Sequence, residues 1–196
     1  MTSKDYDVII IGAGSIGAPT AFFLSQAGYK VLVVEKEASA GQGSNKRAIG
    51  GIRATHSDPA KIRLSMRSLD IFSTWQENYG DDIEWFKGGY TFVAYREQEE
   101  KSLKDLLVKQ KSFGLNIDWL DRKAMLVLVP DLNPDGLLGG TYCPDDGNAS
   151  PLLANHAFFT HAEAQGVDFH FNEPVTGFIM DNGRIDGIIT ENGSYH

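Results

Sequence analysis

The chain has 196 residues, and 18 Lys and Arg against 26 Asp and Glu give it a formal net charge of −8 at pH 7. This acidic balance excludes a nucleic-acid-binding protein that depends on bulk positive charge. Hydrophobic residues make up 42% of the chain and charged residues 22%, which is typical of a globular protein. The composition therefore excludes disorder, collagen and coiled coil as descriptions of the whole chain.

The cysteine content and the apolar runs indicate where the protein is found. Cys143 is the single cysteine and cannot form an internal disulfide, and no segment has the pattern of a signal peptide. The longest apolar run near the start, residues 8–11, is far shorter than the roughly 20 residues that a bilayer span needs. We therefore expect a cytoplasmic protein without a transmembrane segment.

The first 35 residues predict a strand, a turn, a helix and a second strand in immediate succession. Residues 7–11 are a β-branched run typical of a buried strand in a parallel sheet, and the following helix stops at Gly28. Residues 31–34 form the second apolar strand, which ends on Glu35. The turn between the first strand and the helix fits G-x-G-x-x-G and consists of Gly12, Ala13, Gly14, Ser15, Ile16 and Gly17.

This βαβ unit is suited to a dinucleotide. The first glycine makes the tight turn, the second lets a pyrophosphate approach the backbone, and the third lets the helix lie against the strand. The helix N-terminus offers unpaired N–H groups and a partial positive charge to the diphosphate. Glu35 stands near the spacing of about 20 residues at which a carboxylate binds a ribose diol. It would repel a 2′-phosphate, which disfavours NADP.

A glycine-rich loop follows where a plain nicotinamide-binding domain would return to a helix. Residues 38–51 are rich in Gly, Ser and Ala, which predicts a backbone that passes close against another group, such as a flat ring system. Residues 46–67 then gather six basic residues against one acid, Asp58. Among the six, Arg53 is distinct because it lies at the end of the glycine-rich loop and not on a helix face.

In these motifs the chain resembles the FAD-dependent amine and amino-acid oxidoreductases that include glycine oxidase, D-amino acid oxidase and the sarcosine oxidases. The similarity is greatest to the β-subunit type of multimeric sarcosine oxidases and dye-linked proline dehydrogenases. Gly-Ser followed by Gly-Gly-Ile-Arg is the most specific feature, because many folds share the dinucleotide motif. The resemblance is carried by residues 7–14, 35–36, 43–44, 50–53, 88–94, 129–133 and 143–147.

The resemblance implies an α/β fold, with a Rossmann-like FAD-binding βαβ unit and an inserted α+β substrate domain. It implies non-covalent FAD and oxidation of the C–N bond of a small amino acid or secondary amine, such as sarcosine, proline, glycine or a D-amino acid, by hydride transfer to flavin. Arg53 resembles the arginine that holds the substrate carboxylate, which a bidentate guanidinium suits. The implied FAD-binding residues are Gly12, Ala13, Gly14, Ser15, Ile16, Gly17, Glu35, Lys36, Gly43, Ser44, Asn45, Gly50, Gly51, Ile52 and Val175.

The resemblance also sets an expected domain organisation. We expect residues 1–55 and about 166–196 to form an incomplete FAD-binding domain, and residues about 56–165 to form the substrate-side and helical insertions. Members of the family are roughly twice as long as this chain. We therefore expect an N-terminal portion of a longer protein that alone is inactive and binds FAD weakly or folds poorly. Another subunit of an oxidoreductase complex is an expected partner.

The middle of the chain does not alternate strictly between strands and helices, which favours an α+β module. Asp58 followed by a proline predicts a helix start, and apolar residues then recur at helical spacing up to Gly80. The patterns that follow predict a strand at 91–95, helices at 98–113 and 151–165, a strand at 167–171, and a hairpin with its turn at 181–184.

Several other residues could carry chemistry. Cys143 is expected to be a small buried residue and not a nucleophile. His156 and His161 are off the i, i+4 spacing of helical ligands, so we expect no metal site. His56 could belong to the active site or be an ordinary polar loop residue.

Two other functional classes stay open from the sequence. An NAD-dependent dehydrogenase is favoured by the βαβ unit alone and opposed by the glycine-rich loop. A non-catalytic flavin-binding subunit of a larger complex is compatible with the acidic composition.

Overall fold

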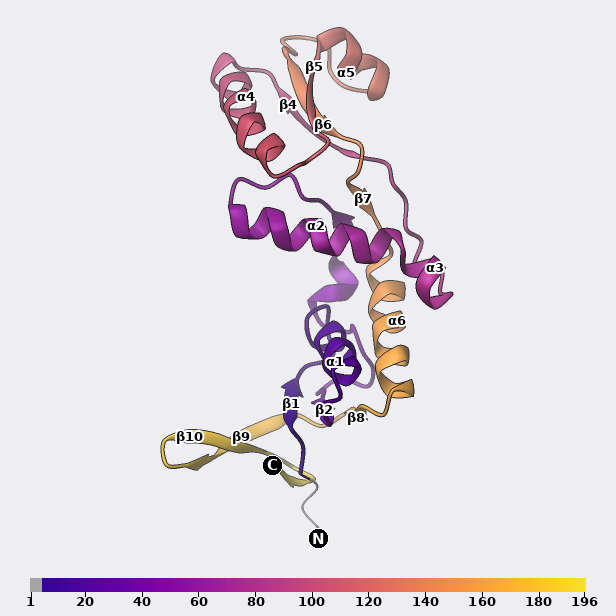
Figure 1. Ribbon diagram of the computed structural model, residues 1–196, viewed down its shortest axis with the longest axis vertical. Helices are drawn as coiled ribbons and strands as arrows, with labels where there is room; N and C mark the ends of the chain where they lie inside the picture. Colours follow the sequence, from indigo (N-terminus) through magenta and orange to yellow (C-terminus); the bar gives the residue numbers. More distant parts are fainter. Residues whose placement is uncertain (1–4) are drawn as a thin grey trace. The chain divides into compact units, whose positions relative to one another are not determined.

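The computed structural model describes residues 5–196, which form two compact units (Figure 1). One unit consists of residues 5–49 and 150–196, and the other of residues 50–149. Each unit has its own sheets and its own hydrophobic core. No helix in residues 5–196 is both long enough and apolar enough to cross a bilayer.

The first unit is built on a parallel three-stranded sheet. Its strands are β1 (Val8–Ile11), β2 (Val31–Val34) and β8 (Asp168–His170), in the order β1-β2-β8. All four residues of β2 are buried, as the apolar run predicts for a central strand covered on both faces. The sequence-based strands at 7–11, 31–34 and 167–171 are therefore confirmed.

Two helices pack side by side next to this sheet (Figure 1). They are α1 (Gly17–Gln26) and α6 (Pro151–Ala164), and the rings of Phe22 and Phe158 meet edge to face, 5.5 Å apart. Helix α6 begins at Pro151 because the Ser150 side chain caps it and proline suits the first helical position. A short 3-10 turn, η1 (Ser44–Arg47), lies in the loop after β2.

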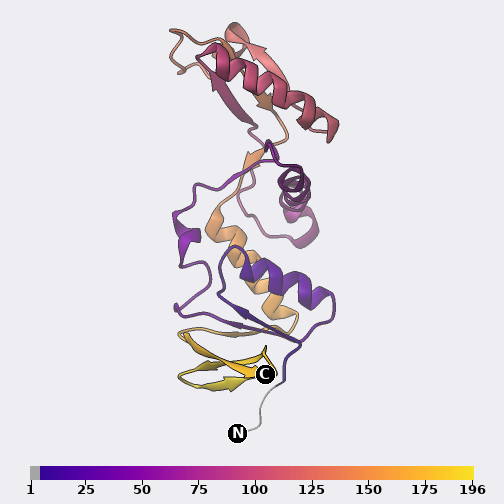
Figure 2. The same ribbon diagram turned by 90° about the vertical axis from the view of Figure 1, so that its left-hand side faces the viewer.

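An antiparallel sheet forms the third layer of this unit. Its strands are β9 (Val175–Asp181), β10 (Arg184–Thr190) and β11 (Gly193–Tyr195). Asn182 and Gly183 both have positive φ, which is the backbone of a tight two-residue hairpin turn. Ile188 is buried against Leu32 and Val34, so the parallel strands lie between this sheet and the helices (Figure 2).

The second unit contains a three-stranded antiparallel sheet and a separate strand pair. The sheet has the order β4-β6-β5, with β4 (Tyr90–Ala94), β5 (Asp118–Asp121) and β6 (Gly139–Cys143). The pair is β3 (Gly51–Ile52) with β7 (Gly147–Asn148), in which Gly51 lies opposite Asn148.

Four helices complete the second unit: α2 (Pro59–Ser73), α3 (Trp75–Tyr79), α4 (Glu97–Ser112) and α5 (Arg122–Leu128). Asp58 caps α2 by accepting a hydrogen bond from the Lys61 N–H at 2.9 Å, as predicted. The predicted helix is interrupted at Thr74, so that Trp75 begins α3. The core of the unit consists of Ala54, Ile62, Leu107, Leu115, Ile117 and Cys143.

The units confirm an α/β fold with a Rossmann-like βαβ element and an α+β module between its parts. Their boundaries, at residues 50 and 150, differ from the expected ones near 56 and 166. Helix α6 was expected in the insertion, yet its buried face, with Ala157 and Phe158, packs on α1. The assignment of one unit to FAD and the other to substrate stays a prediction.

Candidate functional site

The turn between β1 and α1 has the backbone that its glycines predict. Gly12 has φ +101°, a conformation that other residues rarely adopt. A Cβ on Gly17 would lie 1.8 Å from the Gly12 carbonyl oxygen, so only glycine lets the helix approach the strand this closely. A Cβ on Gly14 would meet no atom within 4 Å. Helix α1 starts with no side-chain cap at Ile16 and no acidic residue in its first turn.

Glu35 lies against this turn. Its carboxylate accepts a hydrogen bond from the Ala13 N–H at 2.8 Å and another from the Glu37 N–H at 2.9 Å. The structure therefore brings the end of β2 to the glycine-rich turn, as the dinucleotide pattern requires. A carboxylate has about four lone-pair positions, which leaves acceptor capacity for a ribose diol.

The other expected FAD-binding residues of the first unit lie in different surroundings. Lys36 is exposed just after β2, and Gly43 and Ser44 are exposed at the start of η1. Asn45 is buried, and its side-chain amide donates to the Pro151 carbonyl at 2.8 Å. Val175 opens β9 and packs against the core of the unit. A role of these five residues toward FAD stays a prediction.

Asn155 was not found by sequence reasoning, and Gly41 was predicted only as part of the glycine-rich loop, without its contact to the turn. The Gly41 N–H and the side-chain amide of Asn155 both donate to the Ala13 carbonyl, at 3.0 and 3.1 Å. Asn155 is only 4% exposed. One signal was available in the sequence, because Asn155 shares the buried face of a helix that is otherwise apolar there, with Phe158 and Ala162.

In the second unit, the glycine-rich loop ends in the strand pair that directly precedes Arg53. The Gly50 carbonyl accepts a hydrogen bond from the Ala149 N–H at 3.1 Å, and Gly51 and Ile52 pair with β7 as β3. Arg53 follows directly, and the next residue, Ala54, donates its N–H to the buried carboxylate of Asp146 at 2.8 Å. These bonds fix the backbone on both sides of Arg53.

The Arg53 side chain is half-buried and held from several sides. One of its terminal nitrogens donates to the Thr55 carbonyl at 2.7 Å, and the guanidinium carbon lies 5.1 Å from the Phe92 ring centroid and 5.5 Å from that of Tyr90. Within residues 50–149, no carboxylate lies at ion-pair distance from Arg53. The guanidinium is thus an oriented cation that makes no direct ion pair in its own unit, although it interacts electrostatically with the buried Asp146 carboxyl.

Arg53 also lines a pocket of about 230 Å³ in the second unit, together with His56, Phe92, Gln110 and Thr141 among others. The His56 ring nitrogen Nδ1 lies 3.4 Å from the Arg53 guanidinium. Burial, followed by the positive charge of Arg53, lowers the pKa of His56 below its ordinary value of 6.5. This shift favours the neutral form of His56, which adds little charge to the pocket.

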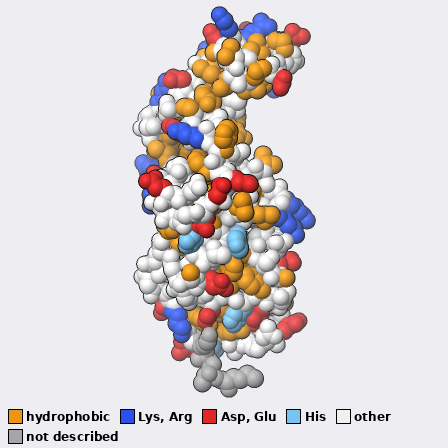
Figure 3. All heavy atoms as spheres, turned by 90° about the vertical axis from the view of Figure 1, so that its right-hand side faces the viewer, with side chains coloured by type: hydrophobic (Ala, Val, Ile, Leu, Met, Phe, Trp, Pro, Cys, Tyr) orange, Lys and Arg blue, Asp and Glu red, His pale blue; other side chains and the backbone are white. Residues whose placement is uncertain are grey.

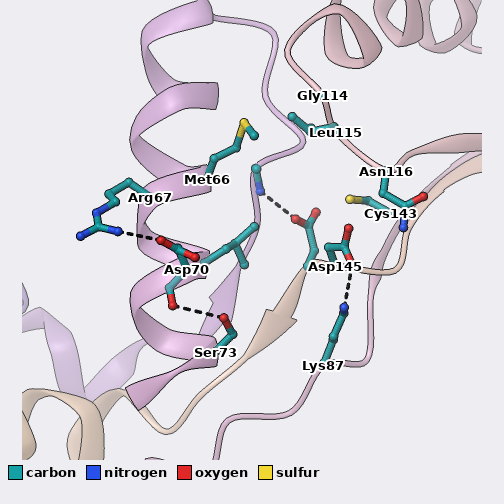
Figure 4. Close-up of a pocket in the computed structure, with 13 residues that line it drawn as sticks. Met66, Arg67, Asp70, Ser73, Lys87, Gly114, Leu115, Asn116, Cys143 and Asp145 are labelled. Carbon is teal, nitrogen blue, oxygen red and sulfur yellow. Dashed lines mark hydrogen bonds and ion pairs between the residues drawn. The ribbon is translucent and has the colours of Figure 1, made fainter. Parts of the chain in front are cut away.

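A second pocket of the same unit, of about 540 Å³, lies between α2 and the turn after β6 (Figure 4). Lys87 and Asp145 form an ion pair across 2.6 Å at this pocket. Cys143, 1% exposed, lines it, and burial raises the pKa of its thiol to about 11. The thiol stays protonated at neutral pH, which agrees with the expected buried, unreactive cysteine.

The described residues offer no ready metal site. In residues 5–196, no group of three or more His, Cys, Asp or Glu side chains is arranged to hold a metal ion.

Comparison with known proteins links these features to a family. A family model described as FAD dependent oxidoreductase (DAO) matches residues 7–196. Sarcosine oxidase subunit beta of Arthrobacter sp. is 28% identical, over 98% of this chain and 49% of its own length. Monomeric sarcosine oxidase of Streptomyces avermitilis is 30% identical, over 89% of this chain and 45% of its own length.

The fold is also found among solved structures. L-proline dehydrogenase from P. horikoshii superposes with a TM-score of 0.92 at 29% identity, over 99% of this chain and 51% of that protein. The chain thus spans about half the length of these three relatives. Because the family match covers both the glycine-rich turn and Arg53, the chain belongs to the FAD-dependent oxidoreductases, whose cofactor is FAD.

Proposed function

We propose that the full-length protein oxidises the C–N bond of a small amino acid or secondary amine, such as sarcosine, proline, glycine or a D-amino acid, with non-covalent FAD as its cofactor. Membership of the FAD-dependent oxidoreductases supports this proposal, as do relatives named sarcosine oxidase and proline dehydrogenase. The observation that carries the proposal is Arg53, whose side chain is fixed in orientation and makes no direct ion pair with a carboxylate within residues 50–149.

The first unit fits the diphosphate and ribose of FAD. The uncapped start of α1 offers N–H donors, the space beside Gly14 lets an anion approach the backbone, and Glu35 has acceptor capacity for ribose hydroxyls. We propose that these residues, with the rest of the turn at 12–17 and with Lys36, Gly43, Ser44, Asn45 and Val175, bind FAD in the complete protein. Gly50, Gly51 and Ile52 of the second unit are proposed to contact the same cofactor.

Arg53 is proposed to bind and orient the substrate. A guanidinium that is stacked on Phe92 and bonded to the Thr55 carbonyl has lost much of its rotational freedom before the substrate arrives. Its remaining N–H groups can hold a carboxylate in a bidentate pair, which sets the direction as well as the position of the substrate. FAD, when bound, supplies the acceptor for the hydride that leaves the carbon next to the amine.

The role of Arg53 is tested in the full-length protein by Arg53→Lys. Lysine keeps the charge and loses the planar fork, so we expect KM to rise about 10- to 100-fold while FAD content is unchanged. Arg63→Lys is a matched control, because Arg63 lies over an aromatic ring, Phe113, in the same unit but outside this pocket. Unchanged kinetics in Arg53→Lys would refute the assignment.

We also propose that the full-length protein is one subunit of an oxidoreductase complex. The similarity to sarcosine oxidase subunit beta supports this, and the comparable similarity to monomeric sarcosine oxidase makes a direct test necessary. The molar mass in solution and mass spectrometry of any co-purifying polypeptide provide it. A second polypeptide in fixed ratio supports the proposal, and a homogeneous single polypeptide that is fully active contradicts it.

A further inference from the structure

The backbone of Ala13, in the middle of the glycine-rich turn, is held by three other segments of its unit. Its N–H donates to the Glu35 carboxylate at 2.8 Å. Its carbonyl accepts from the Gly41 N–H at 3.0 Å and from the Asn155 side-chain amide at 3.1 Å. The end of β2, the loop after it and helix α6 therefore converge on one buried residue.

Asn155 is less favourable for folding than an apolar residue would be in this position if its only function is to pack helices. It is 4% exposed, and its Oδ1 atom has no hydrogen-bond partner among the residues that the structure describes. A buried polar atom without a partner destabilises the folded state, whereas an apolar side chain would pack there without that cost. The bond from its Nδ2 to the Ala13 carbonyl is what the amide contributes.

That bond sets the direction of the next N–H group. Residues 5–196 contain no cis peptide bond, and in a planar trans peptide the carbonyl of one residue and the N–H of the next point in opposite directions. With the Ala13 carbonyl directed at Asn155, the Gly14 N–H is directed away from α6. No residue of the first unit accepts a hydrogen bond from this N–H, and the space beside Gly14 is open.

Gly41 shows how tightly these segments are fitted. It has φ +78°, and a Cβ added to it would lie 3.1 Å from the amide nitrogens of both Asn155 and Asn45. Such a distance is shorter than most real Cβ contacts, so a side chain here would require the two amides to shift slightly. Glycine at position 41 therefore lets the loop supply its N–H to the Ala13 carbonyl without strain at this positive φ.

We propose that Asn155 is a positioning residue for the cofactor: by holding the Ala13 carbonyl it keeps the Gly14 N–H directed at the diphosphate of FAD. The proposal rests on the assignment of this turn to FAD under the proposed function, and it requires neither Arg53 nor a particular substrate. It predicts that removal of the Asn155 amide weakens the binding of FAD and ADP, and that the accompanying change in the stability of the apoprotein is too small to explain this loss of affinity.

The test uses Asn155→Leu in the full-length protein, because leucine has a similar volume and no donor. FAD and ADP are titrated into the apoprotein, and the melting temperature of the apoprotein is measured separately. We expect both ligands to bind about tenfold more weakly, as for the loss of one hydrogen bond. ADP is informative because it carries the diphosphate without the flavin.

Phe158→Leu is the matched control, since it loosens the packing of α6 on α1 and leaves the amide in place. We expect this variant to lower the apoprotein melting temperature while both ligands bind as in the parent. Asn155→Ala replaces the leucine variant if the latter does not fold.

Two results would overturn the proposal. One is binding of both ligands to Asn155→Leu within twofold of the parent. The other is a Phe158→Leu variant that melts at the same temperature as Asn155→Leu and loses as much affinity for both ligands. Helix packing would then explain the effect. A parent protein that binds neither FAD nor ADP would overturn the assignment of the turn as well, which separates failure of the proposed function from failure of the role of Asn155.

Discussion

Gly14 and Gly17 occupy the same turn for different physical reasons. A Cβ at position 17 would collide with the Gly12 carbonyl oxygen at 1.8 Å, so glycine is required there by the protein itself. A Cβ at position 14 would meet nothing within 4 Å, and its φ is not positive, so the protein alone would accept alanine. If glycine is needed at position 14, the need comes from a ligand.

This difference predicts opposite effects for two alanine substitutions. Gly17→Ala is expected to lower the stability of the full-length apoprotein by about 1–3 kcal/mol through overpacking. Gly14→Ala is expected to leave the melting temperature of the apoprotein unchanged and to weaken FAD binding about tenfold or more. Calorimetric melting and FAD titration measure the two quantities. Parent-like FAD affinity in Gly14→Ala would show that no ligand occupies the space beside this glycine.

Asp146 is a buried carboxyl group that supports the backbone next to Arg53. It is fully buried, and its Oδ1 atom accepts the Ala54 N–H at 2.8 Å. Burial raises the pKa of Asp146 above its ordinary value of 3.8, because a low-dielectric environment disfavours the charged form. The folded protein therefore binds this proton more tightly than the unfolded chain does.

The raised pKa makes the effect of Asp146→Asn depend on pH. The contribution of the acid to stability is fully present below pH 3.8 and is lost as the pH rises through the higher folded-state pKa. Asparagine keeps an oxygen for the Ala54 N–H and does not ionise. We expect the variant to become more stable relative to the parent between about pH 4 and pH 7. Denaturant unfolding across this range measures the difference, and a constant difference would contradict the prediction.

At the scale of elements, a buried acid attaches the antiparallel strands to the parallel sheet of the first unit. Glu173 is 5% exposed, and its Oε1 atom accepts hydrogen bonds from the hydroxyls of Thr190 at 2.6 Å and Tyr195 at 2.8 Å. His170 of β8 lies 3.2 Å from Oε2. Burial alone would raise the pKa of Glu173, but the hydrogen bonds outweigh it and hold the pKa below 4.5.

Glu173→Gln is therefore expected to show the opposite pH dependence to Asp146→Asn. A lowered folded-state pKa contributes stability that is present above pH 4.5 and is lost as the pH falls through the folded value. We expect the variant to lose about 1–3 kcal/mol at pH 7, and less as the pH falls below 4.5. The same unfolding series measures it, with Asp186→Asn, an exposed residue of β10 that lies 3.2 Å from His196, as a surface-carboxylate control. A loss that does not shrink in acid would contradict this account.

The sequence predicted those elements whose signals are local. Asp58 before Pro59 marked the start of α2, and the turn at 181–184 marked the β9–β10 hairpin. Strand β6 could not be found in this way, because its glycines normally indicate a loop. In the structure a Cβ on Gly139 would lie 2.4 Å from the Leu120 carbonyl, so these glycines serve the close approach of neighbouring strands.

In the candidate site, too, only the features with a local sequence signal were predicted. The glycine-rich turn and Glu35 follow a spacing rule and were found, whereas the convergence of Gly41 and Asn155 on Ala13 is a tertiary arrangement in which Asn155 lies 142 positions away in the chain. The position of α6 likewise depends on the burial of Phe158 against Phe22, which no local pattern specifies.

At the scale of the whole molecule, the chain provides two units that carry different parts of the proposed chemistry. The first holds the glycine-rich turn proposed to bind FAD and the second holds Arg53. Basic and acidic side chains are interspersed on the face drawn in Figure 3. Since the chain spans about half of its relatives, the complete protein is the proper object for every functional test.

The most direct test of the account is the visible absorption spectrum of the purified full-length protein. It is recorded before and after anaerobic addition of sarcosine, proline, glycine or a D-amino acid, and again on the supernatant after acid precipitation. We predict the bands of oxidised flavin, their bleaching by at least one of these substrates, and their release into the supernatant as non-covalent FAD. A colourless protein that stays colourless after incubation with FAD would contradict the account.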